Sequence, residues 1–148
     1  MINVIKPNKI CPLRALFRRL ALKRIAKALV LASEKSAVVG DDILYRLPGV
    51  FALSITYQES SVRLIKEANT FRIMKDAERS VILLSVTITD QAALEELSEK
   101  RATWQKVYAE GRITFAGKEK YAALFLRAAA EGDKAILSEK QYRELYGE

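Results

Sequence analysis

The sequence predicts an α+β protein in which helices at both ends of the chain surround a group of short strands. Apolar residues recur with the period of a helix near both ends, whereas within residues 50–88 they alternate with the period of a strand. Two glycines, Gly111 and Gly117, isolate one more short strand between apolar helices. The chain has 148 residues, half of them apolar, so one continuous core and a single compact unit are expected.

Composition excludes several classes of site. The chain has no histidine, which excludes Ser-His-Asp and Cys-His triads, HExxH zinc sites and histidine proton shuttles. Its one cysteine, Cys11, cannot form an internal disulfide or a zinc site with several thiolates. No apolar run reaches roughly 18 residues, so no spanning helix is expected. We expect no metal, no cofactor, and a cytoplasmic protein that can associate with a membrane surface.

The net charge of +7 is concentrated at the start of the chain. Residues 34–148 contain 17 bases and 18 acids, so they are nearly neutral. We therefore divide the chain into a basic amphipathic helical segment, residues 1–36, and a domain over residues 37–148. Residues 1–33 contain no acid and eight bases, which are Lys6, Lys9, Arg14, Arg18, Arg19, Lys23, Arg24 and Lys27.

The basic segment is expected to be helical from Pro12, because proline suits the first turn of a helix. Two sets of apolar residues each have the spacing of one helix face: Leu13, Leu16, Phe17 and Leu20, then Leu22, Ile25, Ala26 and Leu29. The sets start nine residues apart, which at about 100° per residue puts them on opposite sides of a straight helix. Either the chain breaks near Leu20-Ala21, or one helix is apolar on two sides.

Several interpretations of this segment stay open. Its apolar faces can simply cover the core. It can also attach to an anionic membrane surface, where each base contributes about 1 kcal/mol at best. A nucleic acid is less favoured, because only one aromatic residue lies among the bases. The residues expected to contact a membrane are Arg14, Phe17, Arg18, Arg19, Lys23, Arg24 and Lys27.

The middle of the chain is expected to form three consecutive strands. In "VFALSITY", residues 50–57, alternate side chains share one apolar face. "VRLIKEA" and "TFRIMKDA" follow and are joined near Ala68-Asn69, where asparagine tolerates a left-handed turn conformation. After a polar break, "SVILLSVTITD" is the strongest strand in the chain. One of its faces is apolar throughout, so that face is expected to be buried.

Helices are expected to dominate the last third of the chain. Thr89 or Asp90 can cap a helix over "QAALEELSEK". A second helix, "ATWQKVYAEG", is expected to end at Gly111, a typical residue for the end of a helix.

The short strand "RITFA" comes next, and Gly117 separates it from the helix "KEKYAALFLRAAAE". We expect Gly132 to stop this helix. Ser138 and Gln141 have the spacing of a capping box, which predicts a last short helix through Tyr146.

This order of elements, and five pieces of sequence within it, resemble the sterol carrier protein type-2 family of lipid-binding domains. The pieces are "VTITD", "QAALEEL", "TWQKVYAE", "GRITFAG" and "YAALFL", and the resemblance covers residues 47–137. In that family the glycine-bounded strand completes a mainly antiparallel five-stranded sheet, and helices covering one face enclose an apolar cavity. The resemblance implies the same fold here and a lipid between the sheet and the helices.

The resemblance also implies non-catalytic carrying or presentation of a lipid, which could be a fatty acyl chain, a phospholipid, a sterol or a quinone-like polyisoprenoid. A lipid-metabolising enzyme is then a natural partner. Burial of such a chain gains about 0.8 kcal/mol per CH₂. Ordinary core packing explains each lining residue equally well. The residues expected to line the cavity are Phe51, Leu53, Ile55, Phe71, Ile73, Leu84, Val86, Ile88, Trp104, Val107, Tyr108, Tyr121, Leu124 and Phe125, with Tyr108 and Tyr121 able to bond a headgroup.

Two other functions compete with lipid binding. An enzyme using a buried carboxylate is less favoured, since no two of the candidates are placed to act jointly. An adaptor would bind an anionic protein or nucleic acid through the basic segment. The candidate carboxylates are Asp90, Glu95, Glu96 and Glu110.

Overall fold

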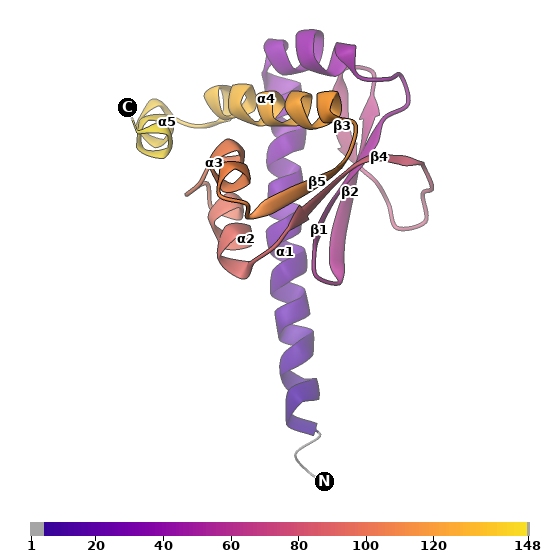
Figure 1. Ribbon diagram of the computed structural model, residues 1–148, viewed down its shortest axis with the longest axis vertical. Coiled ribbons are helices and arrows are strands. Elements are labelled where there is room, and N and C mark those ends of the chain that lie inside the picture. Colours follow the sequence, from indigo (N-terminus) through magenta and orange to yellow (C-terminus); the bar gives the residue numbers. More distant parts are fainter. Residues whose placement is uncertain (1–4, 148) are drawn as a thin grey trace.

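The computed structural model describes residues 5–147 and consists of one five-stranded sheet with helices packed on it (Figure 1). The helices are α1 (Ile5–Lys35), α2 (Gln91–Ser98), α3 (Trp104–Ala109), α4 (Glu119–Ile136) and α5 (Glu139–Tyr146), and a π-helical turn η2 (Val38–Ile43) and a 3₁₀ turn η3 (Leu44–Arg46) follow α1. The strands are β1 (Ala52–Tyr57), β2 (Ser60–Glu67), β3 (Thr70–Ile73), β4 (Ile82–Ile88) and β5 (Ile113–Gly117).

The sheet has the strand order β3-β2-β1-β4-β5. All neighbouring strands are antiparallel except β1 and β4, which are parallel because the chain crosses from the β3 edge back to the centre. The glycine-bounded strand β5 completes the sheet beside β4. The mainly antiparallel five-stranded sheet is thus confirmed, including the position of its last strand.

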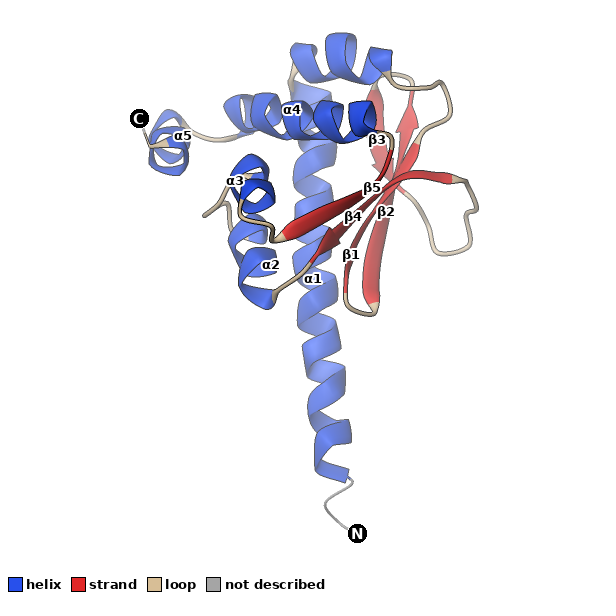
Figure 2. Cartoon of the chain, viewed as in Figure 1, coloured by secondary structure: helices blue, strands red, loops and turns tan. Residues whose placement is uncertain are grey.

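The helices lie on one face of the sheet (Figure 2). Leu53 of β1 pairs with Leu64 and Leu84 of the neighbouring strands, and all three side chains are buried against the helices. The opposite face is polar, and on it the Ser54 hydroxyl donates to the Ser85 hydroxyl at 3.3 Å. Successive side chains of a strand point to opposite faces of the sheet, so the apolar residues of each strand gather on the face that the helices cover.

The basic segment forms one continuous helix, α1, rather than two short ones. The helix starts before Pro12, so the expected start at this proline is wrong. In its C-terminal half, Leu22, Ile25, Ala26 and Leu29 are buried against the sheet and α4. The N-terminal half extends beyond the rest of the molecule (Figure 1). One helix is therefore apolar on two sides, and in the described structure only one side is covered.

The expected end of a helix at Gly132 is also wrong, because α4 continues through this residue to Ile136. A Cβ atom at Gly132 would lie 2.4 Å from the Cβ of Ala32 on α1. The glycine therefore permits α1 and α4 to cross closely. Beside it, the buried Asp133 carboxylate accepts from Lys100 Nζ at 2.9 Å and from the Tyr146 hydroxyl at 2.7 Å, which holds α5 against the domain.

Most of the expected helix and turn signals are confirmed. The Asp90 side chain caps α2 by accepting from the Ala93 N–H at 2.8 Å. Gly111 follows α3 with a φ of +75°, and Ser138 and Gln141 form both bonds of the capping box. The β2–β3 turn differs in detail, since Ala68 rather than the asparagine has the positive φ, +54°.

Candidate functional site: the two faces of helix α1

The residues expected to line an apolar cavity lie mostly in the core. Among them, only Tyr108 is well exposed: 48% of its surface is accessible, and its ring packs on Phe115 at 5.1 Å between ring centroids. Ile73 and Leu124 are partly buried. The buried members are Phe51, Leu53, Ile55, Phe71, Leu84, Val86, Ile88, Trp104, Val107, Tyr121 and Phe125.

The space expected to hold a lipid is filled by these same side chains. The rings of Phe51 and Tyr121 meet edge to face at 5.2 Å, and those of Trp104 and Phe125 at 5.0 Å. Between η2, η3, the sheet and α4 there is a hollow of about 10 Å³, which is about the space of one water molecule. In this conformation the hollow has no room for a hydrocarbon chain, and a lipid bound between the helices and the sheet stays a prediction.

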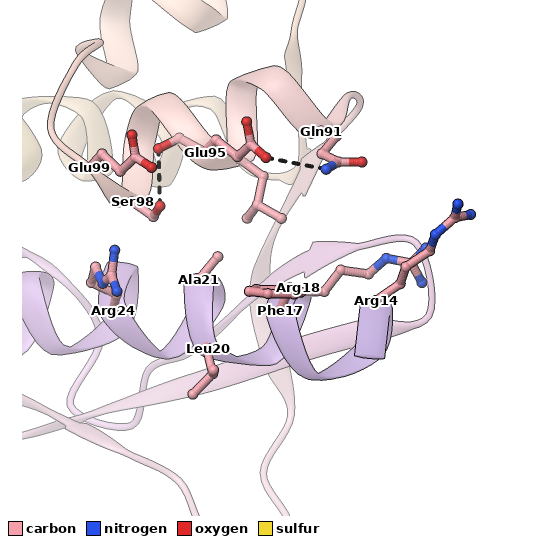
Figure 3. A pocket seen from close by; sticks show the side chains of 11 residues that line it. Arg14, Phe17, Arg18, Leu20, Ala21, Arg24, Gln91, Glu95, Ser98 and Glu99 are labelled. Carbon is pink, nitrogen blue, oxygen red and sulfur yellow. Dashed lines mark hydrogen bonds between the residues drawn. The ribbon is translucent and has the colours of Figure 1, made fainter. Parts of the chain in front are cut away.

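A much larger groove lies between α1 and α2, with a volume of about 720 Å³. Figure 3 shows Ala21 of α1 pointing toward α2, whereas Leu20 points away from it. Leu94 of α2 is a buried apolar residue of the groove. The lining residues are Arg14, Phe17, Arg18, Leu20, Ala21, Arg24, Gln91, Leu94, Glu95, Ser98 and Glu99.

The two walls of this groove carry opposite charges. The α1 wall bears three arginines, and the α2 wall bears Glu95 and Glu99. No ion pair joins the two walls within the described residues. Glu95 instead accepts from the Gln91 amide at 3.2 Å, and Glu99 pairs with Arg101 on its own side at 2.8 Å. The groove thus separates positive and negative groups across a space large enough for a ligand.

On its outer side, the N-terminal half of α1 carries an apolar stripe, which we call the outer row: Leu13, Leu16, Phe17 and Leu20. All four side chains are exposed, and Phe17 has 69% of its surface accessible. A rotation of about 100° per residue places Arg24 and Lys27 in line with the outer row and Arg19 and Lys23 along its edge. Phe17 and Leu20 also line the groove, so the groove opens beside the outer row.

Of the seven residues expected to contact a membrane, six are bases, and the structure leaves Arg14, Arg19, Lys23, Arg24 and Lys27 exposed. Arg18 is half-buried, with its guanidinium 5.8 Å from the Tyr57 ring centroid. The α2 wall of the groove was not expected as a site. Its only signal in the sequence is the pair Glu95 and Glu99, two like charges four residues apart, which a solvent-exposed helix face equally explains.

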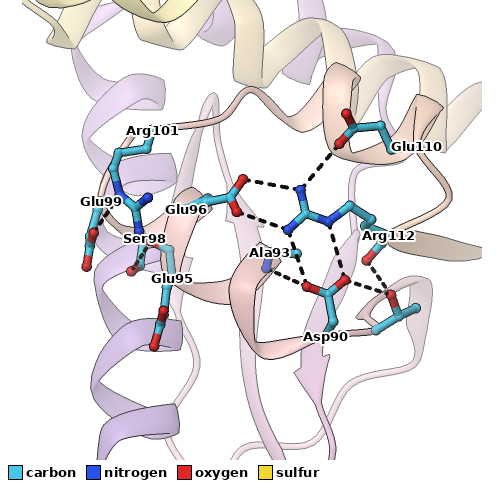
Figure 4. A network of polar contacts seen from close by, with 10 residues as sticks. Asp90, Ala93, Glu95, Glu96, Ser98, Glu99, Arg101, Glu110 and Arg112 are labelled. Atoms are coloured by element: carbon cyan, nitrogen blue, oxygen red, sulfur yellow. Dashed lines mark hydrogen bonds and ion pairs between the residues drawn. The ribbon is translucent and has the colours of Figure 1, made fainter.

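The carboxylates weighed as catalytic candidates mostly belong to a polar network around Arg112 (Figure 4). Arg112 pairs with Asp90 at 3.3 Å, Glu96 at 3.1 Å and Glu110 at 3.3 Å. Hydrogen bonds from Arg112 hold the pKa values of Asp90 and Glu96 below their ordinary range. A general acid requires the opposite shift. The network joins α2 and its cap Asp90 to Arg112, the residue before β5.

Among the side chains that the structure describes, those of residues 13–147, no cluster of three or more acidic or cysteine groups has metal-binding geometry. None of the helices in residues 5–147 is both long enough and apolar enough to span a bilayer.

Comparison with known proteins gives similarity in fold. No protein-family model and no curated protein sequence matches the chain. Among solved structures, the ubiquinone synthesis protein UbiJ-SCP2 aligns with 86% of this chain and 95% of its own, at 15% identity and a TM-score of 0.49. Sterol carrier protein 2 like 2 from Aedes aegypti aligns with 74% and 96%, at 20% identity and a TM-score of 0.44.

The matches also include a much larger enzyme, the sec-alkylsulfatase Pisa1 from Pseudomonas sp.. It aligns with 66% of this chain at 10% identity and a TM-score of 0.45, and the chain spans 15% of its length. Sterol carrier protein domains, the family that the sequence resembles, recur among the similar structures. At these identities the comparison concerns the arrangement of the chain and assigns neither a ligand nor an activity.

Proposed function

We propose that the protein attaches reversibly to anionic lipid surfaces through the N-terminal half of α1 and binds lipid there without catalysis. The observation that carries this proposal is the outer row, four exposed apolar side chains on a helix half that is rich in bases and free of acids. Isolated exposed apolar residues are common on proteins, but a continuous row along a projecting helix marks a contact surface.

The physical chemistry of the outer row suits a membrane interface. A helix lying in the headgroup region buries its apolar side while its bases contact anionic lipid. Full burial of a leucine or phenylalanine side chain gains about 1.5–3 kcal/mol, and each base adds about 1 kcal/mol at best. Partial burial of the outer row together with a few bases is therefore sufficient for reversible attachment.

The groove provides a space for lipid next to that surface, since Phe17 and Leu20 belong to both. Binding between the sheet and the helices stays a prediction and has a structural requirement. A chain there would have to separate contacts such as Phe51 with Tyr121, which means that α4 moves away from the sheet. Native mass spectrometry of the freshly purified protein, followed by organic extraction, would reveal a lipid held in this way.

Co-sedimentation with vesicles tests the attachment. The parent protein should bind vesicles of phosphatidylcholine mixed with phosphatidylglycerol, and bind pure phosphatidylcholine vesicles weakly. The double variant Phe17→Ser/Leu20→Ser should bind the anionic vesicles at least about tenfold more weakly, because it removes two buried side chains. A matched control is Tyr45→Ser/Val50→Ser, which removes exposed apolar residues outside α1 and should bind like the parent.

Unchanged binding of Phe17→Ser/Leu20→Ser would contradict the proposal. Retention on nucleic acid or another polyanion, with no binding to vesicles, would favour the adaptor function instead. Deleting the whole segment 1–33 is not a suitable test. This deletion removes Leu22, Ile25 and Leu29 from the core, so loss of folding would mimic loss of binding.

A further inference from the structure

We infer that the groove between α1 and α2 binds a phospholipid with a zwitterionic ethanolamine-type headgroup, its phosphate on the α1 wall and its ammonium on the α2 wall. The inference deepens the proposed function and rests on it, because it names the class of lipid that the attached protein would hold. The observation that carries it is a groove of about 720 Å³ whose walls have opposite charges and no ion pair between them in the described residues.

The α1 wall is suited to the phosphate. Arg14, Arg18 and Arg24 line the groove over three turns of one helix. Guanidinium groups bind phosphate oxygens through pairs of parallel N–H donors, which gives both strength and orientation. None of the three makes an ion pair with a carboxylate in the part of the chain that the structure describes. Arg14 and Arg24 are exposed, and the half-buried Arg18 lies over the Tyr57 ring.

The α2 wall is suited to the ammonium group. Glu95 of α2 and Glu99, the residue that follows α2, lie one turn apart, and both are exposed groove residues. Glu99 pairs with Arg101 at 2.8 Å, so Glu95 is the carboxylate without a cationic partner in the described structure. Glu95 has only the neutral Gln91 amide as partner, so its carboxylate can accept a bond from a primary ammonium. A purely anionic ligand would meet repulsion from the same wall. This repulsion disfavours nucleic acid, phosphatidic acid and inorganic phosphate as occupants.

The groove is also placed to receive the chains of a lipid. Phe17 and Leu94 provide apolar surface beside the charged groups, and Leu20 lies at the edge of the groove. Because Phe17 and Leu20 belong to the outer row, acyl chains can remain in the bilayer while the headgroup lies in the groove. A trimethylammonium headgroup has no N–H to donate, so phosphatidylcholine lacks the bonds that the glutamates would accept.

A titration with short-chain lipids tests the inference without a bilayer. Dihexanoyl phosphatidylethanolamine, phosphatidylcholine and phosphatidic acid, each below its critical micelle concentration, are added to the full-length protein and followed by backbone amide NMR. We expect the ethanolamine lipid to bind most tightly and to shift the amide signals of Gln91–Glu99. Glycerophosphoethanolamine, which has the headgroup without chains, should bind at the same place and more weakly.

Two double variants test which wall of the groove binds the ammonium group and which binds the phosphate. Glu95→Gln/Glu99→Gln should weaken binding of the ethanolamine lipid about tenfold and strengthen binding of phosphatidic acid, because it removes an ionic hydrogen bond to the former and repulsion of the latter. Arg14→Gln/Arg18→Gln should weaken binding of all three lipids. The control Glu144→Gln changes an exposed glutamate of α5 and should leave every affinity unchanged.

The inference is overturned if phosphatidylcholine or phosphatidic acid binds as tightly as the ethanolamine lipid, or if Glu95→Gln/Glu99→Gln leaves the order of affinities unchanged. Shifts confined to residues outside α1 and α2 would overturn it as well. Because the lipids are monomeric, this assay does not require attachment to a membrane. Failure here combined with normal vesicle binding rejects the groove ligand alone, and the reverse result rejects the attachment alone.

Discussion

The two halves of α1 have nearly the same amino-acid pattern and opposite surroundings. Leu20 and Leu22 are two residues apart, yet 51% of the surface of Leu20 is accessible and only 1% of that of Leu22. The difference does not come from helix propensity, since both are leucine in one continuous helix. It comes from the partner: the C-terminal half packs on the sheet and α4, and the outer row packs on nothing in the described structure.

This contrast shows that an apolar helix face predicts burial but does not tell which surface covers it. In the C-terminal half the covering surface is the chain's own core. In the N-terminal half the same kind of face points outward, beside the arginine wall of the groove. The halves should therefore respond differently to substitution, salt and acid.

The largest difference should come from truncating one leucine in each half. Leu22→Ala should lower the free energy of unfolding by about 2–5 kcal/mol, because it leaves a cavity in the core. Leu20→Ala should change it by less than about 0.5 kcal/mol, as surface substitutions usually do. Urea unfolding followed by far-UV circular dichroism measures both. Equal losses in the two variants would show that the halves are not distinct.

A second substitution tests why the C-terminal half is held so closely. Gly132→Ala should destabilise the protein by about 1–3 kcal/mol, since its new Cβ would lie 2.4 Å from that of Ala32. Adding Ala32→Gly should restore most of the lost stability, because removal of the methyl group at residue 32 makes room for the new one at residue 132. If the double variant unfolds as easily as Gly132→Ala, the close crossing of α1 and α4 is not the cause.

Salt should separate attachment from folding. Raising the salt from about 0.1 M to about 1 M shortens the screening length from about 10 Å to about 3 Å. Vesicle binding should then weaken about tenfold, while the midpoint of thermal unfolding should change little, because the C-terminal half of α1 is held by apolar contacts. Vesicle binding that persists in high salt would show that the bases around the outer row contribute nothing.

Acid should affect the domain but not the outer row, whose helix half has no carboxylate. Hydrogen bonds from Arg72 hold the pKa of Glu78 at about 2, below its ordinary value of 4.5. A depressed carboxyl pKa stabilises the folded state above pH 4.5, and this stabilisation is lost as the pH falls toward 2. Arg72→Gln should flatten the loss of stability over this range in chemical unfolding. If stability depends on pH in the same way in this variant, the ion pair does not contribute to the loss of stability in acid.

The sequence predicted the strands and most helix ends, because these depend on local signals such as the alternation in β1 and the Asp90 cap. It did not predict two features that depend on distant residues. Gly132 has no side chain to show whether it ends a helix or admits a neighbouring one, and only the position of Ala32 decides. The size of the hollow between the sheet and the helices depends on how the rings of Phe51, Tyr121 and Phe125 pack in this conformation, which periodicity does not describe.

The resemblance to lipid-binding domains correctly implied the sheet and the placement of β5, and it implied a lipid site in the interior. The larger space lies elsewhere, between α1 and α2, in a region where the resemblance covers only one wall. The two oppositely charged walls come from segments about 70 residues apart in the sequence. The groove therefore could not be predicted from the sequence of either segment alone.

Hydrogen exchange of backbone amides, with and without anionic vesicles, shows whether the N-terminal half of α1 contacts a lipid surface. In the free protein the amides of residues 13–20 should exchange quickly and those of residues 22–35 slowly. Vesicles should slow exchange in residues 13–20 and leave residues 22–35 unchanged. Slow exchange of residues 13–20 in the free protein, or no change on addition of vesicles, would contradict the claim that the N-terminal half of α1 is covered by a lipid surface.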